Sequence, residues 1–353
     1  MNENISLKPA SIKIDHVVKK FGEVEVLKGI DINIQPGEFF TLLGSSGCGK
    51  TTLLRLIAGF EEMTGGHISF DGKDISSLNP WERNVGFVFQ NYALWPHMSI
   101  YENIAYGLRM RKLPQNAIDE RVRWALSVGG LEGMEKRHPG QLSGGQQQRV
   151  AIVRALVIQP QALLLDEPLS NLDVKLRIKM RKDIKDLQRQ VGITVVYVTH
   201  DQEEALEISD RIAVFEKGVV QQIGRPQEIY KNPANPFVAQ FVGTSNFIEG
   251  TISNDVFITH SGKTIPLSTG NQESGNVKLC FRPEHALLDR EQKEGTFPVT
   301  MKSAAYRGNC VNCVVEAEPG LELTIIADEE FEAGERLWLR IQKYSFFKVP
   351  LKP

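Results

Sequence analysis

Up to about residue 240 the chain alternates short apolar runs with stretches of helical periodicity. Residues 39–43, 162–165 and 193–199 are rich in apolar and β-branched side chains, which indicates strands buried on both faces of a sheet. A helical pattern at residues 53–57 follows the first strand. Apolar residues spaced by four and three predict a longer amphipathic helix, at Leu176, Met180, Ile184, Leu187 and Val191. This alternation predicts an α/β domain with a largely parallel sheet.

The pattern changes twice along the chain. From about residue 91 to residue 159 helical periodicity dominates, which predicts a helical subdomain inserted before the strand at 162–165. Asn232–Pro236 then breaks the pattern, and a linker to Gly243 is expected. Short strand-like runs separated by Gly and polar turns follow, at 251–252, 256–258, 277–281, 311–315, 321–326 and 337–341. We therefore predict a first domain over residues 1–240 and a second, all-β domain over residues 241–353, folded as a small OB-like barrel.

Composition narrows the function without identifying it. The 353 residues suggest about two domains. The 41 Lys and Arg nearly balance the 43 Asp and Glu, so we expect no nucleic acid among the partners, because such binding usually needs a basic face. The first residues lack the basic and apolar regions of a signal peptide, and no apolar run approaches the roughly 20 residues of a spanning helix. Any membrane part is therefore expected from other chains.

The four cysteines predict no disulfide framework, which fits a reducing cytosol. Cys310 and Cys313 form a CxxC pair, but the surrounding residues favour a strand. Residues three apart on a strand point to opposite faces, so the two sulfurs are expected to diverge. No second pair completes a zinc site, and neither a metal nor a redox role is expected.

A glycine-rich loop connects the first buried strand to the helix at 53–57. Its sequence, Gly44-x4-Gly49-Lys50-Thr51, matches the P-loop pattern in the required context of strand, loop and helix. Backbone N–H groups and the helix start would surround phosphate, with Lys50 on the β- and γ-phosphates and the Thr51 hydroxyl on Mg²⁺. The alternative is a glycine-rich turn with a surface lysine. The predicted ATP-binding residues of this segment are Gly44, Ser45, Gly47, Cys48, Gly49, Lys50, Thr51 and Thr52.

Asp166 and Glu167 end the second buried strand. A charged pair at this position is costly to desolvate unless it is paired or holds a cation. We expect Asp166 to hold Mg²⁺ through water and Glu167, one residue further on, to act as the general base. The alternative is a solvated acidic turn.

A second candidate anion site is Leu142-Ser143-Gly144-Gly145-Gln146, which opens a helix predicted from Gln146 to about Val157. Two glycines and a serine at a helix start favour phosphate for the same reasons as the P-loop. A single copy of the chain has no obvious use for two such phosphate-binding segments.

Two helix caps are also predicted, Asp173 for the amphipathic helix and Asp201 with Glu204 as a capping box.

These motifs, in this order, resemble the ATPase subunit of an ABC transporter over about residues 15 to 240, which implies a P-loop NTPase fold. The resemblance implies that Ser143, Gly145 and Gln146 cover the γ-phosphate held by a second copy. It makes Gln90 the residue that touches Mg²⁺ and the attacking water. His200 becomes a γ-phosphate sensor, with a hydrogen-bonded structural histidine as the alternative.

The resemblance also gives roles to residues that the pattern alone leaves open. Asp173, besides capping its helix, would tune the opposite nucleotide site. Phe21 would stack on adenine, and a core residue before the Gly22 turn is equally compatible with the sequence. The apolar stretch from Tyr92 to Met98 would meet the coupling helix of a membrane subunit, the alternative being packing under the helical subdomain.

The β-rich tail, which includes Phe281-Arg282-Pro283-Glu284-His285, resembles the regulatory (TOBE) domain of one importer subfamily. Its members energise uptake of maltose, polyamines, iron(III), phosphonates or sulfate. The resemblance implies a homodimer at the cytoplasmic face of the membrane, with two transmembrane permease subunits and, indirectly, an extracytoplasmic solute-binding protein. The expected cargo is iron(III), a polyamine or a phosphonate.

Two other functions remain to be weighed. A soluble ABC-type ATPase acting on nucleic acid or ribosomes usually carries a long coiled-coil insertion or a second nucleotide domain, and neither is visible. A stand-alone P-loop kinase does not account for the Leu142–Gln146 segment or for His200.

Overall fold

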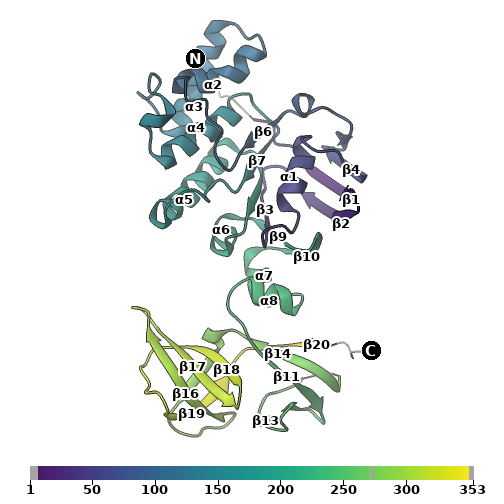
Figure 1. Cartoon of the computed structure of the whole chain (residues 1–353), viewed down its shortest axis with the longest axis vertical. Helices are drawn as coiled ribbons and strands as arrows, with labels where there is room; N and C mark the ends of the chain where they lie inside the picture. Colours follow the sequence, from purple (N-terminus) through teal and green to yellow (C-terminus); the bar gives the residue numbers. More distant parts are fainter. Residues whose placement is uncertain (1–6, 271–272, 350–353) are drawn as a thin grey trace. The chain divides into compact units, whose positions relative to one another are not determined.

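The computed structural model describes residues 7–270 and 273–349 (Figure 1). The chain divides into two compact units between Asn232 and Pro233. The first unit is α/β, and the second is built almost entirely of strands. None of the helices in the described ranges is long and apolar enough to cross a membrane.

A six-stranded sheet organises the first unit, in the order β10-β9-β3-β8-β7-β6. Five of its strands run parallel, and β10 pairs antiparallel with β9 at one edge. The three predicted buried strands are its central members β3, β7 and β8. The strands are β3 (Phe39–Gly44), β6 (Val85–Val88), β7 (Ala162–Asp166), β8 (Thr194–Thr199), β9 (Arg211–Glu216) and β10 (Val219–Gly224).

The central strands are buried throughout and mostly apolar because the sheet separates two hydrophobic cores. Alternate side chains of a strand point to opposite faces. Phe40, Leu164 and Val196 face helix α1 (Lys50–Ala58), whereas their neighbours face α4 (Gly144–Leu156), α5 (Val174–Val191) and α6 (Gln202–Ile208). Charged residues are therefore confined to the ends of these strands, because the strand interiors have no access to water.

The sequence analysis did not predict a second, antiparallel sheet, in the order β2-β1-β4-β5. Its inward side chains complete the core that contains α1. Register shifts between Ile14 and Val17 and between Lys19 and Lys20 interrupt the alternation of apolar and polar residues. The period of two is therefore interrupted within β1, although it is present in the last residues of β2, Ile30–Ile34. The strands are β1 (Ile12–Phe21), β2 (Val24–Ile34), β4 (Gly65–Phe70) and β5 (Lys73–Asp74).

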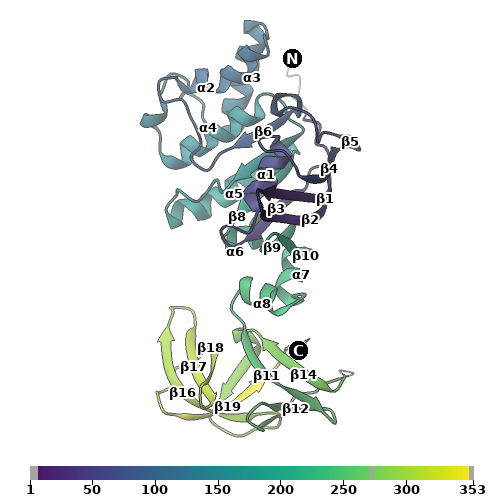
Figure 2. The same ribbon diagram turned by 45° about the vertical axis from the view of Figure 1, so that its right-hand side comes forward.

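Helices α2 (Ile100–Met110), α3 (Gln115–Gly129) and α4 occupy the predicted helical interval and enclose a core of their own (Figure 2). The apolar stretch before α2 divides between burial and exposure. Tyr92 and Leu94 pack into the neighbouring cores, while Trp95 packs against Tyr106 with tilted rings whose centroids are 4.4 Å apart. Packing thus accounts for part of this stretch.

The two predicted helix caps differ in outcome. The Asp173 carboxylate accepts from Leu176 N at 3.0 Å, as expected. Asp201 accepts from the N–H groups of Glu203 and Glu204, but the predicted capping box is wrong in its second half. The Glu204 carboxylate accepts instead from the hydroxyls of Tyr197 and Thr199, because it is buried behind strand β8.

The second unit contains two five-stranded antiparallel sheets around one core, which is the form taken by the expected all-β domain. Helix α7 (Pro226–Lys231) ends the first unit, and the predicted linker contains the short helix α8 (Pro236–Phe241), capped by Asn235. Arg282, from the motif in the tail, donates to Ala239 O and Thr244 O. One sheet contains β11 (Asn246–Ser253), β12 (Val256–Thr259), β13 (Thr264–Ile265), β14 (Gly275–Phe281) and β20 (Ser345–Lys348). The other contains β15 (Ala286–Asp289), β16 (Phe297–Tyr306), β17 (Val311–Glu318), β18 (Leu321–Ala327) and β19 (Arg336–Ile341).

The CxxC pair does not lie on one strand as predicted. Cys313 is fully buried in β17, whereas Cys310 lies in the turn before it and its carbonyl accepts from Arg307 N. Within the described ranges no group of three or more His, Cys, Asp or Glu side chains is arranged to hold a metal ion.

Shortening a buried side chain of β7 tests whether this strand is buried on both faces of the sheet. Leu164 is fully buried, so Leu164→Ala is expected to lower the free energy of unfolding of the first unit by about 2–5 kcal/mol. Urea unfolding followed by the fluorescence of Trp81, Trp95 and Trp124 measures this change. The control Val174→Ala alters a side chain that is 71% exposed and is expected to shift the value by no more than about 0.5 kcal/mol. Equal shifts for the two variants would contradict the assignment of Leu164 to the core.

Candidate active site

The loop between β3 and α1 forms a closed turn around a lysine. Lys50 is only 4% exposed, and its ammonium donates to Gly44 O at 2.7 Å and to Ser45 O at 2.8 Å. A buried ammonium held by neutral carbonyls carries an uncompensated positive charge, which suits an anion. The N–H groups of the first turn of α1 face the same loop, as in other anion sites at helix starts.

The glycines of this loop have specific reasons to be glycine. Gly49 has φ +106°, and a Cβ there would lie 2.7 Å from Leu27 Cδ2. A Cβ on Gly44 would approach Phe215 O to 2.6 Å, so the loop packs directly on β9. Cys48 is buried in the same turn, and burial raises the pKa of its thiol. Cys48 therefore acts as a small packing residue of the loop.

The Thr51 hydroxyl donates to Asp166 Oδ1 at 2.9 Å, so the first turn of α1 meets the end of β7. Asp166 is 8% exposed, and burial raises the pKa of its carboxyl group, an effect that the Thr51 hydrogen bond opposes. A hydroxyl and a buried carboxylate in contact are oxygen ligands of the kind that Mg²⁺ uses together with substrate phosphates. The residues present therefore fit a Mg²⁺ ion, whose charge would offset the burial of Asp166.

Glu167 is at the centre of a group of polar contacts at the same edge of the sheet. Its Oε2 lies 3.2 Å from His200 Nδ1 and 3.5 Å from Gln90 Nε2. Gln90 Nε2 also donates to the Ser170 hydroxyl at 3.2 Å. Glu167 has φ +44°, an uncommon conformation for a non-glycine residue that is often found at functional positions. The structure thus brings Glu167, His200 and Gln90 together.

The Ser143–Gln146 segment lies apart from these residues. Ser143 caps α4, its hydroxyl accepting from Gln146 N at 3.4 Å while Gln146 Oε1 accepts from Ser143 N at 2.9 Å. Ser143 is exposed. Within residues 7–270 and 273–349, no hydrogen bond or ion pair joins this segment to Lys50, Thr51, Asp166 or Glu167.

Phe21 is exposed, which excludes the alternative that it is a core residue. The residue is 47% exposed at the end of β1, and the Lys19 ammonium lies 4.4 Å from its ring centroid. An exposed aromatic face is available to stack on a planar ligand.

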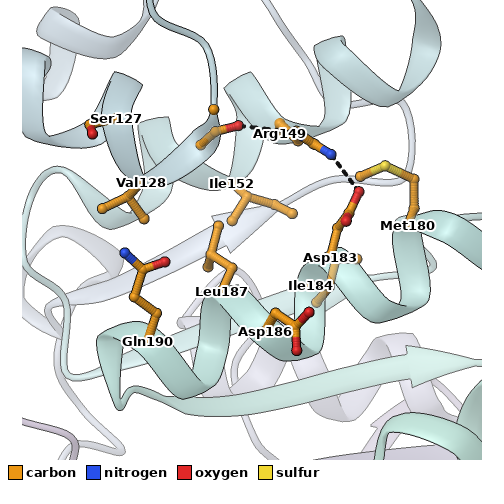
Figure 3. Close-up of a pocket in the computed structure, with 12 residues that line it drawn as sticks. Ser127, Val128, Arg149, Ile152, Met180, Asp183, Ile184, Asp186, Leu187 and Gln190 are labelled. Carbon is orange, nitrogen blue, oxygen red and sulfur yellow. Dashed lines mark hydrogen bonds and ion pairs between the residues drawn. The ribbon is translucent and has the colours of Figure 1, made fainter.

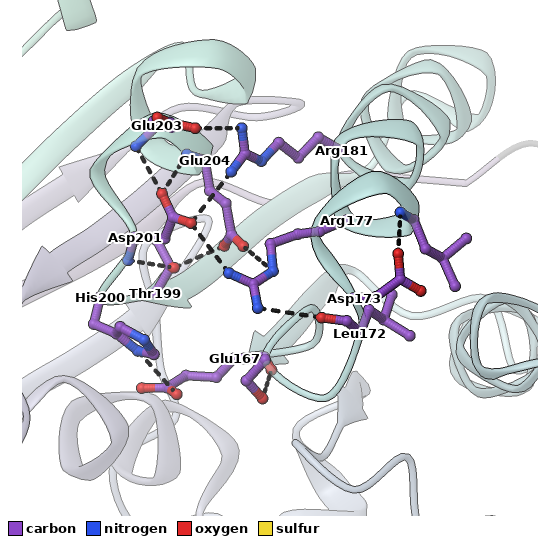
Figure 4. Close-up of polar contacts among 12 residues, drawn as sticks. Glu167, Leu172, Asp173, Arg177, Arg181, Thr199, His200, Asp201, Glu203 and Glu204 are labelled. Atoms are coloured by element: carbon purple, nitrogen blue, oxygen red, sulfur yellow. Dashed lines mark hydrogen bonds and ion pairs between the residues drawn. The ribbon is translucent and has the colours of Figure 1, made fainter. Parts of the chain in front are cut away.

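Two arginines of α5 were missed by the sequence analysis, although both lie close to the site (Figure 4). Arg177 and Arg181 reach the acidic start of α6, where Arg181 Nη2 lies 3.2 Å from Asp201 Oδ2 and Arg177 Nη1 lies 3.5 Å from the same atom. The available signal was position. Basic residues one and two turns after the Asp173 cap could be expected to face a neighbouring acidic helix start.

A separate cavity of about 240 Å³ between α3, α4 and α5 contains none of the predicted site residues (Figure 3). Val128, Ile152 and Leu187 line its apolar part, and an ion pair between Arg149 and Asp183 crosses its edge. This ion pair joins α4 to α5. The cavity therefore belongs to the packing of the helical subdomain against α5.

Comparisons with known proteins show the family of the chain. A family model described as "ABC transporter" matches residues 27–170. The spermidine/putrescine import ATP-binding protein PotA of Clostridium novyi is 47% identical over 87% of this chain and 87% of its own length. The Fe(3+) ions import ATP-binding protein FbpC of Fusobacterium nucleatum is 41% identical over 94% of this chain and 91% of its own.

The solved structures include the ATP-binding cassette MJ0796, described as dimeric in a post-hydrolysis state bound to ADP and Pi. It superposes with a TM-score of 0.54 at 34% identity, covering 61% of this chain and 98% of that chain. PotA and FbpC are 47% and 41% identical to this chain over most of the chain's length. The chain therefore belongs to the ABC transporter family as one of its ATPases.

Proposed function

We propose that two copies of this chain close head to tail around two ATP molecules and thereby drive solute import through separate membrane subunits. The observation that carries this proposal is the separation of two helix starts suited to phosphate. Lys50 opens α1 beside Asp166, whereas Ser143 is exposed at the cap of α4 and, among the described residues, has no hydrogen bond or ion pair to the Lys50 site. A second copy supplies the exposed segment to the first copy's ATP. The dimeric state described for MJ0796 supports this arrangement.

Within one copy, each residue of the Lys50 site has a distinct task. Lys50 and the loop N–H groups bind the β- and γ-phosphates, and Phe21 stacks on adenine. Thr51, Asp166 and Gln90 would hold Mg²⁺, which would neutralise phosphate charge. Glu167 takes the proton of the attacking water, while its contacts with His200 and Gln90 fix the carboxylate. Such proton abstraction accelerates a reaction by about 10²–10⁴.

The partner copy completes the site from the other side. Ser143, Gly144, Gly145 and Gln146 place the start of α4 against the γ-phosphate, where the helix dipole favours negative charge. The ion pair between Arg149 and Asp183 holds α4 on α5 of its own copy. Asp173, at the start of that same α5, then adjusts the opposite site.

The proposed assembly acts at the cytoplasmic face of a membrane. Two permease subunits contact each dimer, with the exposed part of the Tyr92–Met98 stretch as the contact surface, and a solute-binding protein delivers cargo from outside. We place a polyamine first as cargo and iron(III) second, because relatives named for these importers are 47% and 41% identical to this chain. The β-rich second unit is proposed to be regulatory.

Glu167→Gln tests both the chemistry and its coupling to import. The amide keeps the size of the side chain but removes its basicity, so kcat for ATP hydrolysis is expected to fall by about 10²–10⁴ with ATP binding retained. In the native host, the same change is expected to abolish uptake of labelled putrescine and spermidine, or of iron(III). The control Glu120→Gln changes an exposed carboxylate of α3 and leaves both rates unchanged. Normal hydrolysis by Glu167→Gln would remove the base from the mechanism, and normal uptake of all three solutes would contradict the importer.

Asp166→Asn tests the metal site through pH. Burial raises the pKa of Asp166 above 3.8, so the folded protein favours the protonated carboxyl group. The stability that the protonated group contributes is fully present below pH 3.8 and is lost as the pH rises through the folded-state pKa. Nucleotide-free Asp166→Asn is therefore expected to unfold at higher urea concentration than the native protein at pH 7, with the difference vanishing toward pH 3.8.

With added Mg-ATP the native protein is expected to be more stable than Asp166→Asn. At a hundredfold excess over Kd a ligand stabilises a protein by about 2.7 kcal/mol, and Asp166→Asn is expected to lose most of this gain. If Mg-ATP stabilised both proteins equally, Asp166 would not hold the metal.

A further inference from the structure

Arg177 links the Leu172–Asp173 segment to the His200–Asp201 segment, and no other described hydrogen bond joins these two segments directly. Its Nη2 donates to Leu172 O at 3.2 Å, and its Nη1 donates to Asp201 Oδ2 at 3.5 Å. Leu172 immediately precedes Asp173, and Asp201 immediately follows His200 (Figure 4). One guanidinium thus connects the residue before the α5 cap to the residue after the histidine.

The histidine end of this link is firmly held. Asp201 N donates to the Thr199 hydroxyl at 2.9 Å, and that hydroxyl donates to the buried Glu204 carboxylate at 2.7 Å. The backbone on both sides of His200 is therefore tied to the start of α6. A displacement of His200 is expected to move Asp201, and Arg177 with it.

Arg177 also has space to move closer to Glu204, and such a movement would be favourable. Arg177 Nε is buried without a hydrogen-bond partner and lies 3.9 Å from Glu204 Oε1. An unpaired buried donor is costly, so a shift of less than 1 Å that forms this bond is favourable. A polar hollow of about 40 Å³, bordered by Glu167, His200 and Arg177, lies beside the link and leaves space for such a shift.

Arg181 shows what Arg177 adds. It lies one turn further along α5 and pairs with Asp201, Glu203 and Glu207, so it also holds the start of α6. None of its described contacts reaches Leu172. Holding α6 on α5 needs only an arginine such as Arg181, whereas the contact with Leu172 O is specific to Arg177.

We propose that Arg177 is a positioning residue that couples the two ATP sites. It transmits the position of His200 in one site to the Leu172–Asp173 segment, which in the dimer faces the other site. This inference rests on the proposed head-to-tail dimer. The planar guanidinium suits the task because its donors address two acceptors at once, which the single ammonium of lysine does less well.

The test is the dependence of the hydrolysis rate of the full chain on ATP concentration. The native protein is expected to give a sigmoidal curve. Arg177→Met is expected to lower kcat about tenfold and to bring the Hill coefficient to about 1, with the half-saturating ATP concentration changed less than about threefold. Arg177→Lys, which keeps the charge, is expected to give an intermediate Hill coefficient. The matched control Arg181→Met loses thermal stability but keeps the native Hill coefficient.

The possible outcomes distinguish failure of the Arg177 role from failure of the proposed dimer. A native Hill coefficient in folded Arg177→Met overturns the role of Arg177. Should Arg177→Met fail to fold, a native Hill coefficient in Arg177→Lys has the same meaning. Equal loss of cooperativity in Arg181→Met would reduce Arg177 to general support of α6. A native protein that is neither cooperative nor dimeric with ATP would instead remove the proposed dimer.

Discussion

The site depends on one constraint, the burial of three neighbouring parallel strands on both faces. Inside β3, β7 and β8 there is no place for a charge, and the first charged positions come where the strands end. The register aligns these ends, since Leu43 pairs with Thr199 and Asp166 pairs with Val198. Gly44, Glu167 and His200 therefore leave the sheet at a common edge, as ligand sites in open α/β sheets do. Each strand contributes one part of the chemistry, and packing sets the distances between the parts.

Burial at this edge also explains why the site is incomplete without its ligands. Lys50 and Asp166 are both almost inaccessible to water, yet they are held by neutral partners, the loop carbonyls and the Thr51 hydroxyl. Buried charges of this kind are stabilised by ions of the opposite sign. Phosphate beside Lys50 and Mg²⁺ beside Asp166 satisfy both requirements together. The groups proposed to enclose the far side of the phosphate lie at the start of α4, where Ser143 is exposed, and in the proposed dimer a second copy supplies them.

The candidate site residues lie at the strand ends and helix starts where the sequence predicts them, because each motif combines a strand end with the loop or helix start that follows it. The P-loop, the Asp166–Glu167 pair and the Asp173 cap need only neighbouring residues to be recognised. The errors concern contacts between different elements, which residue spacing within one helix does not reveal. Glu204 has the spacing of a capping box but turns to Tyr197 and Thr199, since burial against β8 offered other donors. Arg177 was missed because its partners, Leu172 O and Asp201, include a backbone carbonyl and a residue on another helix.

The central claim, that one copy's Ser143 segment completes the other copy's ATP site, is tested most directly by light scattering of purified Glu167→Gln protein with and without Mg-ATP. The variant retains bound ATP, so the account predicts monomers without nucleotide and dimers with it. Adding Ser143→Arg to the same protein fills the exposed helix start with a bulky cation and is predicted to prevent the dimer. Monomers at saturating Mg-ATP, or dimers that tolerate Ser143→Arg, would contradict the account.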